Sequence, residues 1–108
     1  MDIELTVAER FAIMGILPEK GNIVTIKLLR EFKEAVAFNE QEVNAIELNL
    51  SDEGKATWVV AKEKKIGKKK IELSDILAES IRSNLKMLDS KKQLTEAHVP
   101  IWDMFCEK

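Results

Sequence analysis

The chain has 108 residues, of which 45% are hydrophobic and 33% charged, with a formal net charge of −2. This length fits one domain, and the apolar fraction is that of an ordinary globular protein, so a globally disordered chain is excluded. No apolar run approaches the roughly 20 residues that a membrane-spanning helix needs, and the acidic start Met1–Glu4 lacks the basic residues of a signal peptide.

The charge is segregated along the sequence. Residues 1–54 carry 11 acidic and 5 basic side chains, residues 55–70 carry 7 lysines and one glutamate, and residues 71–108 carry 7 acidic and 5 basic side chains. The three net charges are therefore −6, +6 and −2, so the chain has one basic segment without being basic overall. The single cysteine, Cys106, permits no internal disulfide, which fits a reducing cytoplasm.

The first predicted helix begins after Thr6 and runs through Met14. Thr6 and Glu9 have the spacing of a capping box, and Gly15 is placed to end the helix. Pro18 blocks continuation, so residues 16–21 should form a turn. The inward residues of this helix are expected to be Val7, Phe11 and either Met14 or Ala8.

Asn22 is a candidate N-cap for a second helix. Its β-branched start, Ile23–Ile26, could be helix or strand, whereas Lys27–Phe38 has clear helical periodicity. We expect its apolar face to consist of Leu28, Leu29, Phe32, Ala35 and Val36.

A second capping box, Asn39 to Glu42, predicts a short third helix that uses Val43 and Ile46. The period then changes to two over residues 46–50, which indicates a strand. Residues 51–54 form a predicted turn in which Gly54 can adopt positive φ, and residues 56–60 form the returning strand of a hairpin.

The best-defined element is a helix over Ser74–Lys92, preceded by a possible third strand over residues 69–73. Ser74 is a suitable N-cap, Asp75 favours the start of a helix, and Lys91 and Lys92 favour its end. The predicted core stripe comprises Leu77, Ile81, Leu85 and Leu88, widened by Ile76 and Ala78.

The last predicted helix contains Ile101, Trp102 and Phe105. It begins either at Thr95 or, after a turn, with Pro100 at its first position, where the missing N–H costs nothing. The fold class is therefore α+β, a single domain over residues 1–108 with three N-terminal helices, a small antiparallel sheet and two C-terminal helices.

No catalytic, metal-binding or cofactor-binding constellation is present in the sequence. His98 and Cys106 are eight residues apart, about 12 Å along a continuous helix, which is too far for a thiolate–imidazole pair. The four glycines are scattered as turn residues rather than gathered in a phosphate loop. We therefore expect a protein that is not an enzyme and that needs no cofactor.

The basic segment offers one functional hypothesis, with Gly67 as a turn inside it. Its lysines could contact phosphates, or they could simply keep a hairpin edge solvated. Three helices followed by a hairpin is also the order of a winged helix–turn–helix domain, although residues 39–44, which would read DNA, carry two acids and no base. The candidate nucleic-acid or anion-binding residues are Lys62, Lys64, Lys65, Lys68, Lys69 and Lys70.

The second hypothesis is a protein interface. Large apolar residues near the end of the chain and in the hairpin could pack in the core, or they could form an exposed stripe for self-association or a partner. The candidate interface residues are Trp58, Ile101, Trp102 and Phe105.

The layout of Leu5–Arg10, Ile16–Pro18, Gly21 and Leu94–Glu96 resembles that of small bacteriophage and prophage proteins without an assigned activity. The resemblance implies a host-cytoplasmic setting in which small proteins often act by binding others, and it transfers no site residues. The leading hypothesis is thus a non-enzymatic, phage-associated interaction protein with a protein partner, which could be a second copy of itself. The alternative is a winged-helix-like nucleic-acid-binding module. No membrane association is expected.

Overall fold

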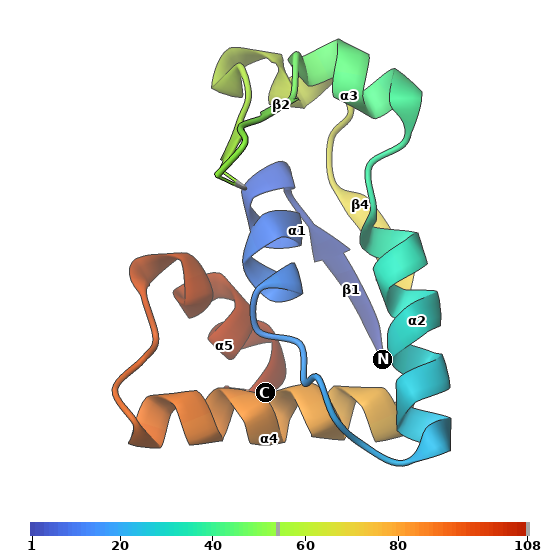
Figure 1. Ribbon diagram of the computed structural model, residues 1–108, viewed down its shortest axis with the longest axis vertical. Helices are drawn as coiled ribbons and strands as arrows, with labels where there is room; N and C mark the ends of the chain where they lie inside the picture. The colour runs from blue at the N-terminus through green and yellow to red at the C-terminus, as the bar shows by residue number, and fades with distance from the viewer. Residues whose placement is uncertain (54, 108) are drawn as a thin grey trace.

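The computed structural model describes residues 1–53 and 55–107, and it is a mixed helical protein with small antiparallel sheets (Figure 1). Helix α4 lies across the base of the view, and α2 stands at its N-terminal end. Strand β1 and helix α1 lie between α2 and α5. The elements in chain order are β1 (Asp2–Leu5), α1 (Val7–Met14), α2 (Ile23–Val36), α3 (Glu40–Ile46), β2 (Asn49–Leu50), β3 (Ala56–Thr57), the 3-10 helix η1 (Val60–Lys65), β4 (Lys69–Glu72), α4 (Asp75–Ser90), the 3-10 helix η2 (Glu96–His98) and α5 (Val99–Phe105).

The predicted third strand exists as β4, but its partner is β1 rather than the hairpin. The two strands run antiparallel with Ile3 opposite Ile71 and Leu5 opposite Lys69. The backbone N–H of Leu73 extends the pairing to the carbonyl of Met1, at 2.7 Å. The expectation of one small sheet is therefore wrong for the described residues, which form two separate pairs of strands, β1–β4 and β2–β3.

The main core lies between the β1–β4 sheet and the helices α1, α2, α4 and α5. One face of the sheet is buried because Ile3, Leu5 and Ile71 all point to it, as alternation along a strand requires. The side chains that the helices contribute to this core include Ile13, Leu29, Phe32, Val36, Leu77, Ile81, Leu85, Ile101 and Phe105.

Helix α4 is confirmed, with one correction. The Ser74 hydroxyl accepts the N–H of Leu77 at 3.2 Å, as an N-cap should. Leu77, Ala78, Ile81 and Leu85 are buried, and Leu88 is half-buried against the core. Ile76, however, is 55% exposed, because its 100° step from Leu77 turns it to the outer side of the helix.

The caps of the first three helices are also confirmed. The Thr6–Glu9 and Asn39–Glu42 boxes both form, and the Asn22 side chain accepts the N–H of Thr25. The open question about Ile23–Ile26 is resolved as helix. Both alternatives for an inward residue of α1, Met14 and Ala8, are exposed, because the buried side of that helix consists of Val7, Arg10 and Ile13. Ala35 is exposed too, and α2 ends at Val36 rather than at residue 38.

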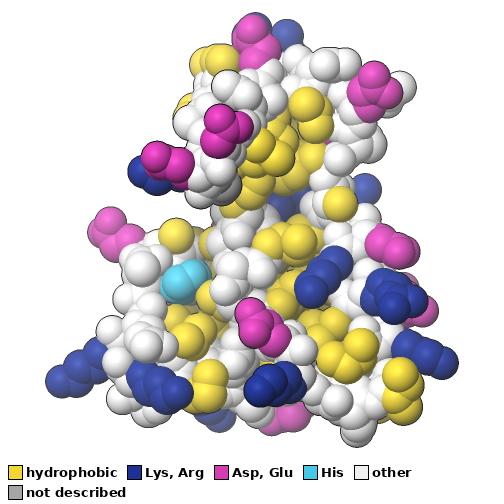
Figure 2. Space-filling view, viewed as in Figure 1, with side chains coloured by type: hydrophobic (Ala, Val, Ile, Leu, Met, Phe, Trp, Pro, Cys, Tyr) yellow, Lys and Arg dark blue, Asp and Glu magenta, His cyan; other side chains and the backbone are white. Residues whose placement is uncertain are grey.

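Helix α3, strands β2 and β3 and helix η1 form what we call the upper lobe. The predicted strands are much shorter than expected, since Ile46 belongs to α3 and the chain turns left-handed at Glu47, with φ 54°. Val59 donates its N–H to the Ile46 carbonyl at 2.9 Å, and η1 begins directly afterwards. Gly67 has the expected turn geometry, with φ +63°, while the prediction for Gly54 lies outside the described residues. Figure 2 shows the lobe joined to the rest of the molecule by a narrow region.

The C-terminal segment follows the second of the two predicted alternatives. Residues Glu96–His98 form a 3-10 turn, and α5 begins at Val99 with Pro100 in its first turn. Ile101 and Phe105 are fully buried, so they close the core against α4.

Candidate functional site

The six candidate lysines do not form one binding surface. Lys62 forms an ion pair with Glu47. Its hydrogen bond and charge, together with the charge of Lys65, lower the pKa of Glu47 below its usual value. Lys69 is half-buried on the inner face of β4, and its charge contributes to the lowered pKa of Glu42. One of the six lysines is therefore paired with a carboxylate of this chain, and the charge of a second acts on another carboxylate.

On the outer face of the β1–β4 sheet, carboxylates offset the charge of a third lysine. Lys70 lies opposite Glu4, and Asp2 lies opposite Glu72, with all four side chains exposed. The positive potential around Lys70 is therefore reduced by three carboxylates on neighbouring positions. Lys64, Lys65 and Lys68 are exposed on η1 and the loop after it. The basic segment seen in the sequence is thus partly neutralised in the fold, because carboxylates from other parts of the chain lie near some of its lysines.

The four candidate interface residues are mostly packed. Ile101 and Phe105 are in the core, so of the two readings that the sequence left open, core packing holds for these positions and the exposed stripe does not. Trp58 is half-buried, stacks on Phe11 with ring centroids 5.0 Å apart, and donates its indole N–H to Glu63 at 2.7 Å. Trp102 is half-buried, with its indole N–H donated to Glu107 at 2.8 Å.

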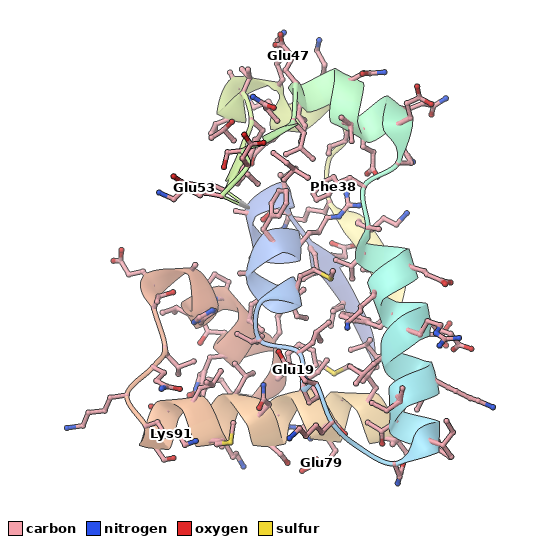
Figure 3. All side chains as sticks on the ribbon, in the orientation of Figure 1. Glu19, Phe38, Glu47, Glu53, Glu79 and Lys91 are labelled. Atoms are coloured by element: carbon pink, nitrogen blue, oxygen red, sulfur yellow. The ribbon has the colours of Figure 1, made fainter. Side chains whose placement is uncertain are left out.

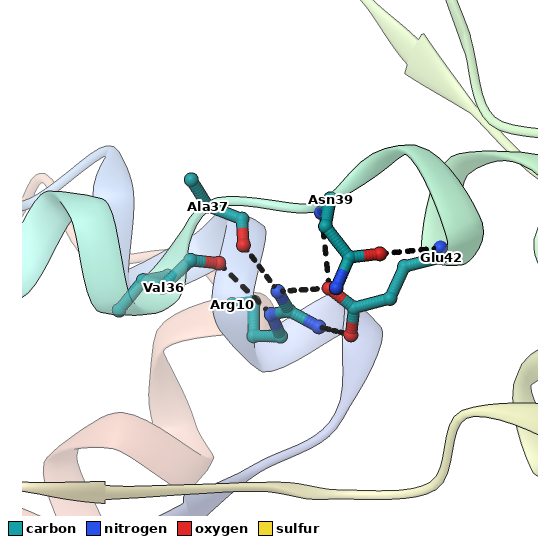
Figure 4. Close-up of polar contacts among 5 residues, drawn as sticks. All are labelled: Arg10, Val36, Ala37, Asn39 and Glu42. Atoms are coloured by element: carbon teal, nitrogen blue, oxygen red, sulfur yellow. Dashed lines mark hydrogen bonds and ion pairs between the residues drawn. The ribbon is translucent and has the colours of Figure 1, made fainter.

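The chain has a buried arginine that sequence reasoning missed (Figure 4). Arg10 is 1% exposed. It donates Nε to the Val36 carbonyl at 2.9 Å, Nη2 to the Ala37 carbonyl at 2.7 Å, and both Nη atoms to Glu42. Its guanidinium also lies 3.7 Å from the centre of the Phe38 ring. These contacts fix α1 to the α2–α3 connection, so we assign Arg10 a structural role.

A signal for this arginine was present in the sequence. Val7, Arg10 and Ile13 recur every three residues and form the buried side of α1. An arginine on that spacing is exposed if the predicted inward face of the helix is wrong. If the face is right, the arginine is buried and needs hydrogen-bond acceptors for its donors. Sequence alone could not supply the acceptors, because Glu42 is 32 residues away.

The single histidine and the single cysteine show no sign of a catalytic role. Nδ1 of His98 accepts the backbone N–H of Thr95 at 3.0 Å. Burial raises the pKa of the Cys106 thiol, which disfavours the reactive thiolate. Across residues 1–53 and 55–107, no group of three or more His, Cys, Asp and Glu side chains is placed to hold a metal ion.

An open groove of about 820 Å³ lies between α4, the α1–α2 loop and the start of α2. The loop is held against α4 because Asn84 donates its side-chain N–H to the Ile16 carbonyl. Gly21 permits a close turn, since a Cβ there would lie 3.1 Å from the Thr25 side chain. Pro18, Lys20 and Asn22 belong to this wall.

The other wall of the groove is the outer side of α4. Its residues Ile76, Ser80, Ser83 and Met87 recur at helical spacing, and Ile76 and Met87 are 55% and 44% exposed. Asp75 and Glu79 stand one turn apart at its edge, with Glu79 paired to Arg82. Figure 3 shows Glu79 on the side of α4 that faces away from the core. The groove therefore combines two large apolar side chains with small polar residues and an acidic rim.

Comparison of the chain with protein-family models, curated proteins and solved structures found no match. None of the helices in the described part of the chain is both long enough and apolar enough to cross a membrane. The groove on α4 is the feature from which a function can be argued.

Proposed function

We propose that this chain is a non-enzymatic interaction protein, a small phage-associated accessory factor of the host cytoplasm, and that it binds a protein partner in the α4 groove. The observation that carries the proposal is the pair Ile76 and Met87, two large apolar side chains exposed on one stripe of a helix that also lines a groove. Exposed apolar surface of this kind, rimmed by polar residues, is typical of interaction sites.

The composition of the groove favours a helix as the bound element. Ser80 and Ser83 are small residues between Ile76 and Met87, so an incoming helix can approach α4 closely at the centre. Helix-in-groove recognition reads apolar anchors at such spacings. Glu79 is already paired with Arg82. It is therefore better suited to the charged edge of a helix–helix contact than to proton transfer.

The test is affinity capture with a matched pair of variants. Tagged wild type, Ile76→Glu and Ile23→Glu are each co-expressed in host cells with an untagged copy of the chain. Ile23 is 67% exposed and does not line the groove, so it controls for an added surface charge. Proteins captured by wild type and Ile23→Glu should be lost from Ile76→Glu. Equal capture by all three would contradict a role for the groove.

The alternative proposal, a nucleic-acid-binding module, is supported by the exposure of Lys64, Lys65 and Lys68. Tight, salt-sensitive gel shifts that disappear on changing these three lysines to glutamate would replace the leading proposal. We expect weak binding instead, because neighbouring carboxylates offset much of the charge of this segment.

A further inference from the structure

We propose that the partner in the groove is a second copy of this chain, with α4 of one copy packed antiparallel against α4 of the other about a two-fold axis. The inference rests on the proposed function, because it names the occupant of the same groove. Three properties of α4 carry it: the order of its outer residues, the placement of its charges and the room beside it.

The outer stripe of α4 is complementary to itself. Ile76, Ser80, Ser83 and Met87 are separated by four, three and four positions, so from either end the order is large, small, small, large. A two-fold interface requires a surface that matches its own copy. Antiparallel pairing about the middle of the stripe places Ile76 opposite Met87 of the second copy and Ser80 opposite Ser83 of the second copy.

The spacing also matches what two packed helices need. Alternating steps of three and four keep a stripe facing the neighbouring helix, as in coiled coils. The stripe spans 12 residues, about 16 Å or three turns. Serines at its centre allow a close approach there, while Ile76 and Met87 fill the space at both ends.

The charges of α4 favour the antiparallel direction. Acidic Asp75 and Glu79 lie toward its N-terminus, basic Lys86 lies toward its C-terminus, and Lys91 is the C-cap. Figure 3 labels Glu79 and Lys91 on this helix. Glu79 and Lys86 are one heptad apart and flank the stripe on the same side, so antiparallel pairing brings each near its opposite on the second copy. Parallel pairing about a two-fold axis would instead place this flank of the two copies on opposite sides of the contact, so neither Glu79–Lys86 pair could form.

Both flanking residues are available for this contact. Glu79 is 65% exposed although it is paired with Arg82, and Lys86 is exposed. On the opposite side of the stripe, Pro18 and Lys20 bound the groove, leaving room for a helix to rest against the loop as well as against α4. Since the helix contact spans only three turns, we expect a dimer that dissociates on dilution.

Analytical ultracentrifugation of the purified full chain over micromolar to millimolar concentrations tests the dimer. The wild-type protein should change from monomer to dimer as its concentration rises. Ile76→Glu and Met87→Glu should each raise the dissociation constant about tenfold or more, because they place unpaired carboxylates in the contact. Ile23→Glu should leave it unchanged. Circular dichroism checks that each variant is folded, which the exposure of the mutated side chains favours.

A charge exchange tests the direction of the helices. Glu79→Lys and Lys86→Glu should each weaken the dimer, and the double exchange should restore it. Cross-linking in a Cys106→Ser background gives an independent check of the register: Ser80→Cys chains mixed with Ser83→Cys chains should form a disulfide dimer more readily than either alone. Preferential coupling of Ser80→Cys with itself would overturn the antiparallel register.

The outcomes separate this inference from the proposed function. A chain that stays monomeric, or a dimer unaffected by Ile76→Glu and Met87→Glu, overturns the α4 pairing. If groove-dependent capture of a different protein persists in that case, the proposed function stands. If capture also fails to depend on Ile76, both proposals are overturned.

Discussion

Arg10 illustrates how one side chain can decide the arrangement of several elements. Its guanidinium is buried, and its donors are met by two carbonyls and by both oxygens of Glu42. Bidentate geometry of this kind is specific to arginine, because the planar guanidinium matches a carboxylate with two parallel hydrogen bonds. The capping residue Glu42 serves two purposes, since the oxygen that accepts the N–H of Asn39 also accepts from Arg10.

Replacing Arg10 with methionine should destabilise the protein by about 3–5 kcal/mol. The substitution keeps an apolar stem but leaves Glu42, which is 14% exposed, without its buried partner. Arg10→Lys should cost less but not restore stability, because an ammonium cannot make the same four contacts. Urea denaturation measures both values. A loss below about 1 kcal/mol for Arg10→Met would show that the network is not structurally important.

The same network predicts a dependence of stability on pH. The hydrogen bond from Arg10 lowers the pKa of Glu42 below its usual value of 4.5, aided by the Asn39 N–H and the charges of Arg10 and Lys69, while burial acts in the opposite direction. Folding therefore favours the ionised carboxylate, which stabilises the protein above pH 4.5 and stabilises it progressively less as the pH falls below that value.

Denaturation of wild type and Glu42→Gln at a series of pH values tests this dependence. The difference in unfolding free energy should be largest near neutral pH and should shrink as the pH falls below 4.5. A difference that grew toward acid pH would contradict the proposed ionisation of Glu42 in the folded state.

Residue-scale prediction from the sequence worked where the interaction was local. Thr6, Asn39 and Ser74 each accept an N–H three residues away, so the cap and its partner are visible together. It failed for Arg10, whose carboxylate partner is 32 residues away. It also failed at Ile76, where an apolar side chain beside a clear core stripe was assigned to the core although helix geometry turns it outward.

At the scale of elements, α4 carries two distinct faces. Its inner face fills the core with Leu77, Ile81 and Leu85, and its outer stripe borders the groove. The inner face was predictable from periodicity. The groove was not, because its second wall comes from a loop whose approach to α4 depends on the contact between Asn84 and the Ile16 carbonyl.

Ile81→Ala tests the inner face. Ile81 is fully buried in the middle of the stripe, so its truncation should cost about 2–5 kcal/mol through lost burial and the cavity left behind. Ile23→Ala removes the same atoms from an exposed helical position and should change stability by less than about 0.5 kcal/mol. Equal effects in urea denaturation would show that α4 is peripheral to the core.

At the scale of the whole molecule, the upper lobe is attached by aromatic stacking as well as by Arg10. Phe11 of α1 stacks on Phe38, with centroids 4.9 Å apart, and on Trp58 of the lobe. Figure 2 shows apolar side chains gathered around this narrow region. The lobe's own strands are only two residues long, so its order depends on these attachments.

Trp58→Ala should therefore loosen the lobe while sparing the main core. Amide hydrogen exchange should accelerate at Leu48, Ser51 and Val59, whose N–H groups are bonded within the lobe, and remain slow at Leu73, which extends the β1–β4 pairing. Uniform acceleration across both groups would instead mean that the lobe and the core unfold as one cooperative unit.

The pairing of β1 with β4 bears on how the chain folds as it is synthesised. β1 precedes its partner by more than 60 residues, so during translation its buried face, with Ile3 and Leu5, waits until β4 has left the ribosome. At about 5–20 residues per second, this delay lasts several seconds. Closing so long a loop is entropically costly and slows folding. An early apolar segment awaiting a late strand is therefore the point at which the nascent chain would most benefit from a chaperone.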